Sequence, residues 1–373
     1  MKSARIRLFS VKYPYTENTE ELFQKAMQEN VSFHYQHCPE YRKILDSRKF
    51  SPEHVTDENG LEKLPFLPTL LFKHHHLFSI PERKLPVKAT SSGTKGSFSR
   101  IGLDWSSLLC GFLMVLHTAK WRKLLSFRPV NYIILGYQPN HNNQMAVMKT
   151  AFGATFFAPA LHRVYALKYQ NGTYQADLDS LLKQLIQFSK QKHPVRFMGF
   201  PSYTYFLLKI MQERNILCPL PNGSKIMFGG GWKQFQAEAV EKQALYAMIK
   251  KYLNVSEKNI IEFFGAVEHP ILWCDCPAHH FHVPVYARAI IRDIHTLEPL
   301  PMGEKGLVNL LTPMIKAVPV SSIMTDDIGI LHSGETCSCG LRVPYLELLG
   351  RAGMKEIKTC AAGASELLKG QNL

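Results

Sequence analysis

The 373-residue sequence predicts an α/β fold with mixed sheets that are covered by helices on both faces. Apolar strand-like runs alternate with helical patterns through the middle of the chain, and glycines follow four of these runs, at Gly136, Gly199, Gly229 and Gly265. Ligands bind such sheets where strands end in glycine loops, so we expect a ligand crevice there. From about residue 283 to 345, short strands between Gly and Pro predict a small β-rich lobe.

The composition indicates a folded protein that binds anions. Hydrophobic residues make up 46% of the chain, and the net charge is +14. The basic residues are spread out, without a dense cluster or a nucleic-acid-binding motif, which favours an anionic substrate over nucleic acid. No apolar run reaches the ~18 residues of a membrane span, and the first residues do not resemble a signal peptide. We therefore expect a cytoplasmic protein without a disulfide framework.

The first 85 residues are expected to be mostly helical and to pack on the core as an N-terminal segment, residues 1–86. Asn18 and Glu21 have the spacing of a capping box at the start of a helix. Apolar residues then recur with helical spacing at Leu22, Phe23, Met27 and Val31. The run at 73–76, a lysine and three histidines, is interpreted as a solvated loop or a helix start, because adjacent histidines cannot all face one metal.

The core, residues 87–345, is predicted from alternating elements. Helices are expected over residues 108–116, 177–192, 202–214 and 238–252. Strands are expected over residues 132–136, 195–199, 226–228 and 259–264, and in the lobe over 285–291, 307–311 and 328–331. Residues 346–373 would form a short C-terminal tail.

The run at residues 89–97 reads ATSSGTKGS and cannot pack into a core, because its residues are small or polar. Glycines allow the backbone to approach a ligand closely, and amide and hydroxyl groups donate to phosphate oxygens. The run lacks the spacing of a P-loop, so taken alone it is equally typical of a flexible loop.

Three further motifs follow this loop along the chain, at residues 263–269, 324–329 and 349–351. Taken singly, Glu268 or Asp327 is more typical of a carboxylate in a surface turn. The order and spacing of all four motifs together resemble the adenylate-forming superfamily, whose members activate carboxylic acids with ATP. The resemblance implies a large N-terminal adenylation domain, with the mobile C-terminal domain of that superfamily missing or reduced to the short tail.

The resemblance also implies roles for individual residues. Glu268 would bind Mg²⁺, Asp327 would hold the ribose hydroxyls, and Arg351 would lie near the α-phosphate of ATP. These residue types suit the chemistry, because a developing anion needs donors and Mg²⁺ needs hard oxygen ligands. The phosphate-facing and other nucleotide-binding positions would be Ser91, Ser92, Gly93, Thr94, Gly96, Gly230 and Gly265.

Within the superfamily, the chain is similar to the acyl-protein synthetase (LuxE) family, short relatives of phenylacetate-CoA ligases. The similarity runs from about residue 23 to 367 and includes the motifs at residues 228–233, 265–270 and 279–284. It implies that the protein activates a long-chain fatty acid, loads the acyl group onto its own cysteine and passes it to a partner acyl reductase. That cysteine would be Cys360, where Lys355 and Lys358 would favour the thiolate; a buried structural cysteine is the alternative.

Two departures from the superfamily pattern affect these expectations. The phosphate loop has Lys95, Ser97 and Phe98 where a second threonine and a Lys-Pro pair are usual, so Lys95 is expected to supply the positive charge. Only 22 residues follow Arg351, so neither a rotating domain nor its catalytic lysine can be assigned. Transfer of the acyl group to coenzyme A becomes a weaker alternative.

Two Cys-x-Cys pairs about 60 residues apart are typical of a closed tetrahedral zinc site, in which each pair supplies soft ligands from a tight turn. Phenylacetate-CoA ligase relatives carry similar elements. The expected ligands of a structural zinc ion are Cys276, His282, Cys337 and Cys339. His280 and Cys274 are possible substitutes, and free reduced thiols are the alternative.

Three functions remain open from the sequence. The first is the fatty-acid-activating ligase with Cys360 as acyl acceptor, which uses ATP, Mg²⁺ and zinc. The second keeps the adenylation and passes the acyl group to coenzyme A, an amine or a carrier protein. The third is a non-catalytic nucleotide-binding subunit, which the altered phosphate loop and the short tail keep open.

Overall fold

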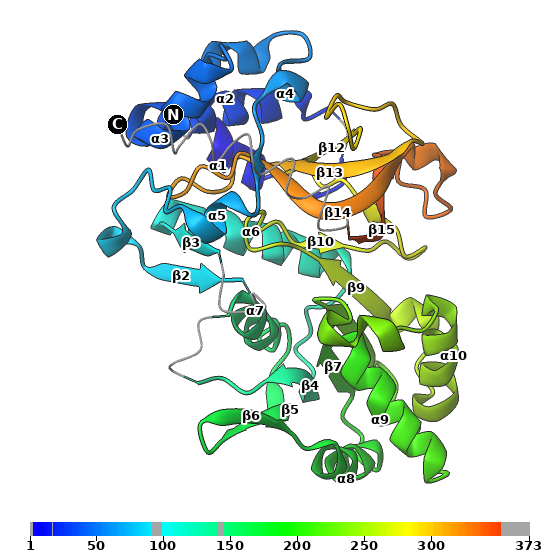
Figure 1. Cartoon of the computed structure of the whole chain (residues 1–373). Coiled ribbons are helices and arrows are strands. Elements are labelled where there is room, and N and C mark those ends of the chain that lie inside the picture. Colours follow the sequence, from blue (N-terminus) through cyan, green and yellow to red (C-terminus); the bar gives the residue numbers. More distant parts are fainter. Residues whose placement is uncertain (1–2, 17, 92–98, 141–144, 352–373) are drawn as a thin grey trace. The chain divides into compact units, whose positions relative to one another are not determined.

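The computed structural model describes residues 3–16, 18–91, 99–140 and 145–351, with the backbone alone at Val147, Lys233, Gln234 and Gln236. The chain divides into two compact units (Figure 1). The first unit combines residues 1–121 with 265–373, and the second consists of residues 122–264. Each unit is described separately below. The expected segment boundaries near residues 86 and 345 lie inside the first unit and stay predictions.

The N-terminal part of the first unit is helical, as predicted. Its helices are α1 (Ala4–Phe9), α2 (Glu20–His37), α3 (Pro39–Ser47), α4 (Gly60–Lys63), α5 (Leu71–His74) and α6 (Trp105–Trp121), with 3-10 turns η1 (Pro52–Thr56) and η2 (Glu82–Lys84). The predicted capping box is wrong. Thr19 is the N-cap of α2 and makes no side-chain capping bond, and Asn18 before it adopts a left-handed conformation with φ +64°. The lysine-histidine run begins inside α5.

The main sheet of the first unit forms the predicted β-rich lobe. Its strands are β11 (Phe281–His282), β15 (Tyr345–Arg351), β14 (Ser322–His332), β13 (Lys305–Leu311) and β12 (Arg288–Arg292), in that order, with β1 (Leu67–Pro68) parallel to β14. The strand β14 is much longer than the predicted 328–331, because it pairs with β13 on one side and β15 on the other. The unit also contains β10 (Trp273–Cys274), the 3-10 turn η6 (Gly334–Thr336), and a hairpin of β2 (Val87–Thr90) and β3 (Arg100–Leu103).

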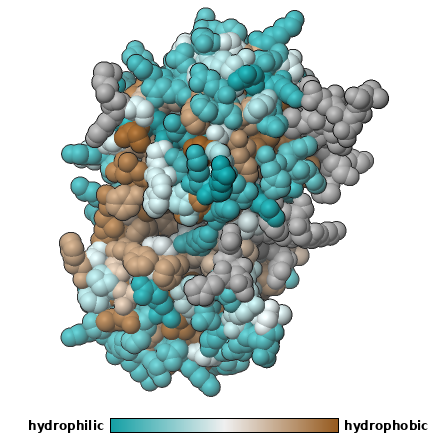
Figure 2. Space-filling model, turned by 90° about the vertical axis from the view of Figure 1, so that its left-hand side faces the viewer, coloured by the Kyte–Doolittle hydropathy of each residue, from teal (hydrophilic) through white to brown (hydrophobic). Residues whose placement is uncertain are grey.

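The helix α6 was predicted from its apolar pattern, but that pattern does not show which side is buried. Cys110, Met114 and Thr118 are buried, whereas Trp105 and Phe112 on another side are 75% and 64% exposed. Apolar residues also gather on part of the molecular surface in Figure 2. Among the helices of the described residues, none has the length and apolar character needed to cross a membrane.

The second unit is a largely parallel sheet with helices. Its strands run in the order β9 (Ile260–Phe264), β8 (Lys225–Gly229), β7 (Val195–Gly199), β4 (Val130–Tyr137), β5 (Ala160–Gln170) and β6 (Thr173–Ala176). Only the pair β5–β6 is antiparallel among the strands of this unit. The helices are α7 (Ala146–Ala154), α8 (Leu178–Ser189), α9 (Pro201–Glu213) and α10 (Lys242–Leu253), with 3-10 turns η4 (Lys233–Glu238) and η5 (Glu257–Asn259).

The core of the second unit explains why its elements were visible in the sequence. Buried side chains of one sheet face, such as Ile133, Phe197 and Ile226, pack with apolar residues of α8, α9 and α10 in one cluster. This burial produces the strand runs and the helical periodicity that predicted the elements. The predicted helix at 238–252 begins only at Lys242, because residues 233–238 form the separate turn η4. Strands β7 and β8 end at Gly199 and Gly229, as predicted.

Candidate active site and metal centre

The predicted phosphate loop is closed at its base by the β2–β3 hairpin. The amide of Ser99 donates to Ser91 Oγ at 2.9 Å, and the amide of Ser91 donates to the carbonyl of Ser99 at 3.1 Å. The hairpin register continues these bonds, with Thr90 opposite Arg100. The remaining predicted loop residues Ser92, Gly93, Thr94, Lys95 and Gly96 lie outside the described residues.

Glu268 lies close to this base. It follows the glycine turn after β9 and is only 5% exposed. Burial raises the pKa of the Glu268 carboxyl, while the adjacent Ser99 hydroxyl and the more distant ammonium of Lys73 lower it. The negative charge of Asp326 raises it further. A buried carboxylate with so little compensation is a favourable ligand for a cation.

The strand β14 supplies two more carboxylates to the same cluster. Thr69 Oγ1 donates to Asp326 Oδ1 at 3.0 Å, and the amide of Asp327 donates to Thr325 Oγ1 at 3.2 Å. Burial raises the pKa of Asp327, Arg351 lowers it, and the charges of Asp326 and Glu268 raise it. The acidic residues of motifs two and three are therefore electrostatically coupled, although almost 60 residues separate them in the sequence.

Arg351 completes the described part of the cluster. It is the cross-strand partner of Asp327, and its Nε lies 3.9 Å from Asp327 Oδ1. Its side chain is 79% exposed, so this ion pair contributes little to stability. The guanidinium is instead available to an anionic ligand beside Asp327. The sequence predicted Glu268, Asp327 and Arg351, and the structure brings all three into one unit.

Sequence reasoning missed four members of this cluster, Thr69, Lys73, Ser99 and Asp326. The parallel pairing of β1 with β14 places Thr69 beside Asp326, and α5 follows directly and carries Lys73. The motif spacing gave no signal for Thr69 or Lys73. The run that contains Lys73 is interpreted from the sequence as a solvated loop or a helix start, and Lys73 lies in the helix α5.

The two glycines predicted to bind nucleotide have different surroundings. A Cβ at Gly265 would lie 3.1 Å from the carbonyl oxygen of Ile271, so the turn toward Glu268 leaves little room for a side chain. Gly230 belongs to the second unit and follows β8 with φ +81°, a conformation that favours glycine. Their roles in nucleotide binding stay predictions.

A second cluster in the first unit gathers the four predicted metal ligands. One ligand atom each from Cys276, His282, Cys337 and Cys339 lies within 4.8 Å of every other. The sulfurs of Cys276 and Cys337 are 3.7 Å apart, and His282 Nε2 lies 3.3 Å from Cys339 Sγ. Tetrahedral zinc with Zn–S bonds of about 2.3 Å places two sulfurs roughly 3.8 Å apart, so the donor set fits this ion.

The surroundings of the cluster orient its ligands. His282 Nδ1 donates to the carbonyl of Val343 at 2.7 Å, which leaves Nε2 as the metal-binding nitrogen. The amides of Ala278 and Leu341 lie 3.3 and 3.5 Å from the sulfurs of Cys276 and Cys339, where they stabilise thiolates. Burial raises the pKa of Cys276 to about 12, so its deprotonation requires a compensating cation.

The two possible substitute ligands do not belong to this set of four. His280 Nδ1 lies 3.2 Å from Cys337 Sγ, and its ring stacks on Tyr345, so it lies beside the cluster. Cys274 is buried, and its backbone carbonyl accepts a hydrogen bond from the hydroxyl of Tyr15 at 3.0 Å.

The predicted acyl acceptor, Cys360, lies outside the described residues. Three of the other described cysteines are poor nucleophiles. Burial raises the pKa of Cys38 and of Cys110 to about 11, and it also raises the pKa of Cys218. Such thiols are almost fully protonated at neutral pH.

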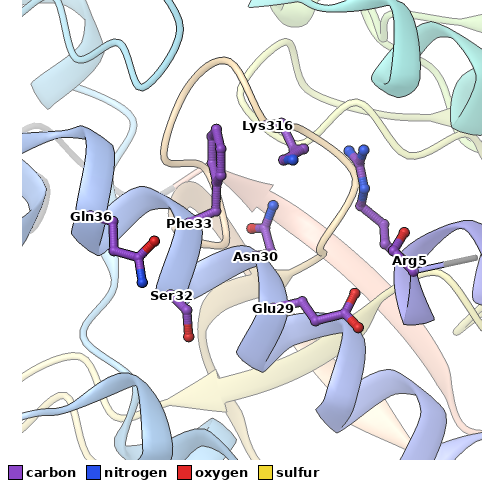
Figure 3. Close-up of a pocket in the computed structure, with 8 residues that line it drawn as sticks. Arg5, Glu29, Asn30, Ser32, Phe33, Gln36 and Lys316 are labelled. Carbon is purple, nitrogen blue, oxygen red and sulfur yellow. The ribbon is translucent and has the colours of Figure 1, made fainter. Parts of the chain in front are cut away.

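A cavity of about 220 Å³ lies in the first unit between α1, α2 and Lys316 (Figure 3). The ammonium of Lys316 packs over the ring of Phe33 at 4.1 Å, and Arg5 donates to the carbonyl of Met314 at 2.7 Å. Both carboxylate oxygens of Glu29 face the amide of Ala4. None of the predicted site residues lines this cavity, so it does not belong to the carboxylate cluster.

Proteins of similar sequence are ligases that act on carboxylic acids. The "Long-chain-fatty-acid--luciferin-component ligase" of Aliivibrio fischeri is 26% identical over 369 residues, which cover 95% of this chain and 90% of the relative. The protein of the same name from Vibrio harveyi is 23% identical over 365 residues, with the same coverage. The phenylacetate-coenzyme A ligase of Thermus thermophilus is 22% identical, and the match covers 90% of this chain and 71% of that enzyme.

Solved structures agree on the fold. The 2-hydroxyisobutyryl-CoA ligase in complex with 2-HIB-AMP superposes with a TM-score of 0.67 at 14% identity, over 91% of this chain and 70% of that enzyme. The predicted adenylate-forming fold is thereby confirmed. Residues 9–369 match the family described as "Acyl-protein synthetase, LuxE". The chain therefore belongs to the LuxE family of acyl-protein synthetases.

Proposed function

We propose that this protein activates a long-chain fatty acid with ATP and Mg²⁺, transfers the acyl group to its own Cys360, and delivers it to a partner acyl reductase. Family membership supports the first two reactions in their general form. The observation that carries the proposal at the level of residues is the cluster of Glu268, Asp326 and Asp327 beside the base of the predicted phosphate loop.

The reaction has two balanced steps. A carboxylate oxygen of the acid attacks the α-phosphorus of ATP, and pyrophosphate leaves with the electron pair of the broken P–O bond. The thiolate of Cys360 then attacks the acyl carbon of the adenylate, and AMP leaves as the thioester forms. Energy from ATP is thus retained in a thioester, which is reactive enough for reduction by the partner.

The residues of the carboxylate cluster have separate roles in this proposal. Glu268 holds Mg²⁺, which when bound neutralises charge on the phosphates. Asp327 accepts hydrogen bonds from the ribose hydroxyls, and Arg351 stabilises the charge that develops at the α-phosphate. Lys73 supplies a second positive charge near Glu268. Lys95 and the phosphate-loop residues are proposed to bind the phosphates.

We further propose that Cys276, His282, Cys337 and Cys339 hold a structural zinc ion. The donor atoms match the size of a tetrahedral site, and the amide–sulfur and His282–Val343 contacts match those expected around metal ligands. Four protein ligands leave no open position, so the ion would stabilise the β-rich lobe and take no part in the reaction.

Intact-protein mass spectrometry tests the proposal. The protein is incubated with MgATP and single fatty acids of different length, with and without hydroxylamine. We expect a mass gain of one acyl group, removed by hydroxylamine, absent in Cys360→Ser and retained in the matched control Cys218→Ser. Pyrophosphate release without a mass gain would indicate that the acyl group is passed to coenzyme A, an amine or a carrier protein instead of to Cys360. If neither a mass gain nor pyrophosphate release is seen with any acid, even with the reductase partner present, the remaining function is a non-catalytic nucleotide-binding subunit.

A further inference from the structure

A row of cationic side chains crosses the sheet of the second unit near the amino-terminal ends of its strands. Tyr132 on β4 is in register with Arg163 on β5 and with Arg196 on β7, and Arg196 is in register with Lys225 on β8. Register partners in a parallel sheet point to the same face. Three cations and one phenol therefore share one face, opposite the face that carries Ile133, Phe197 and Ile226.

Arg196 is the unusual member of this row. Its side chain is only 3% exposed, and its Nε and Nη1 have no hydrogen-bond partner. The hydroxyl of the neighbouring Tyr132 is also buried without a partner. A buried guanidinium normally forms hydrogen bonds or ion pairs, because desolvating an unpaired charge has a cost on the order of several kcal/mol. Among the described residues, Tyr132 is a polar neighbour of Arg196, but no carboxylate pairs with the guanidinium.

The two ends of the row differ. Arg163 is exposed, and its Nε donates to Thr155 Oγ1 at 2.8 Å. Lys225 is half-buried, and its Nζ has one long contact, 3.5 Å to Asn259 Oδ1. Burial lowers the pKa of Lys225, and the positive charges of Arg196, Arg122 and Lys123 lower it further. No carboxylate is found among the groups that shift this pKa within the described chain.

The acidic residues that flank this sheet are engaged elsewhere in the second unit. Asp177 pairs with Lys168 at 2.9 Å, Asp179 pairs with Arg214 at 2.6 Å, and Glu262 pairs with Lys242 at 2.8 Å. Among the described residues, no carboxylate is therefore paired with Arg196 or Lys225.

The row lies away from the expected nucleotide crevice. Lys225 is the first residue of β8 and Gly229 the last, which separates them by about 13 Å along an extended strand at ~3.3 Å per residue. Ligand crevices of parallel sheets lie at the carboxyl ends of the strands. A ligand at Lys225 would therefore occupy a different site from one at Gly229 and Gly230.

We propose that the amino-terminal edge of this sheet binds a phosphate-type oxyanion. Lys225, which is only half-buried, contacts the anion. Arg196 contributes its charge from behind, because its Nε and Nη1 are covered from solvent. A dianion suits the site better than a single carboxylate, because several cations lie together without a counter-charge. Inorganic phosphate, pyrophosphate and the phosphate group of a small metabolite share this chemistry.

Isothermal titration calorimetry at constant ionic strength tests the site. Phosphate, pyrophosphate and AMP are titrated separately into the full chain, with sodium chloride as the reference salt. We expect saturable binding of at least one of these three probes, weakened at least about tenfold in Lys225→Gln and restored in Lys225→Arg. The matched control is Lys258→Gln, an exposed lysine on the neighbouring turn η5, which should bind like the unmodified protein.

A second variant addresses the buried charge. Arg196→Met removes an uncompensated cation, so we expect a higher melting temperature than the unmodified protein in phosphate-free buffer, together with loss of the phosphate response. Unchanged oxyanion binding in a folded Lys225→Gln protein would place the binding elsewhere, and no saturable binding of any probe would show that there is no such site. Either result would overturn the proposal. The test does not depend on catalysis and is separate from the proposed ligase activity.

Discussion

Arg351 and Asp327 are cross-strand partners on β15 and β14, with the guanidinium Nε 3.9 Å from the carboxylate Oδ1. The pair joins two motifs that would act on different parts of ATP, the ribose and the α-phosphate. Because Arg351 is largely exposed and Asp327 is mostly buried, the carboxylate keeps a fixed position while the arginine remains able to meet a ligand.

Replacement of Asp327 tests the ribose contact. Asp327→Asn keeps the shape of the side chain and removes its charge, so we expect kcat/KM for ATP to fall roughly ten- to hundredfold, as for a lost hydrogen bond to a charged group. Pyrophosphate release at varied ATP concentration measures this. Asp179→Asn, which removes a surface ion pair with Arg214, is the control and should leave kcat/KM unchanged. Equal values for Asp327→Asn and the unmodified protein would exclude the contact.

Glu268 should make stability depend on pH. Burial raises the pKa of this carboxyl above its unfolded value of about 4.3, so between these two values the folded state holds a proton that the unfolded state has lost. The stability contributed by Glu268 therefore falls as pH rises through this window. Without nucleotide or metal, Glu268→Gln should melt at a higher temperature than the unmodified protein at pH 8, and the difference should shrink toward pH 5.

The higher melting temperature expected for Glu268→Gln should disappear when MgATP is present. MgATP should stabilise the unmodified protein more than Glu268→Gln, because the metal compensates the buried charge. Glu213→Gln, an exposed glutamate on α9, serves as the control in both series. A lower melting temperature for Glu268→Gln at pH 8 would contradict the assignment of an uncompensated carboxylate. Differential scanning fluorimetry across pH gives the required comparison.

Lys73 is predicted to act on the reaction and to contribute little to folding. Its ammonium lowers the pKa of Glu268 from a distance, and it is only partly buried on the short helix α5. Lys73→Met should lower the rate of acyl-adenylate formation by about tenfold or more, with a melting temperature close to that of the unmodified protein. Lys84→Met on the exposed turn η2 is the matched control. Pyrophosphate release at saturating substrate measures both, and equal rates would remove Lys73 from the mechanism.

The zinc proposal predicts one equivalent of zinc per purified chain by elemental analysis. Cys337→Ser should lose the metal and melt about 5–10 °C lower, because metal binding contributes directly to folding free energy. Cys218→Ser, a buried thiol of the second unit whose sulfur lies 3.6 Å from the carbonyl of Leu185, should keep its zinc. If the purified protein contains no metal and a chelator does not change its melting temperature, the result would favour the alternative that the three cysteines are free thiols.

The local structure of the second unit was largely predictable from the sequence. Burial on one sheet face and along one side of each helix leaves a periodic apolar pattern. It identified β7 to the residue, the ends of α9 to within one residue and the ends of α8 to within three. Element ends depend on local conformations that periodicity does not encode. Asn18 at the start of α2 and the turn η4 before α10 are the two examples.

The sequence by itself determined the adenylate-forming fold, the family, the four residues of the Cys-His cluster and part of the carboxylate cluster, because these depend on motifs with fixed local spacing. Only the tertiary structure decided which distant groups meet. The parallel pairing of β1 with β14 brings Thr69 to Asp326, and the hairpin of β2 and β3 brings Ser99 toward Glu268. The register of β4, β7 and β8 likewise aligns Tyr132, Arg196 and Lys225. Strand pairing is set by packing over the whole sheet, so no local pattern in the chain records it.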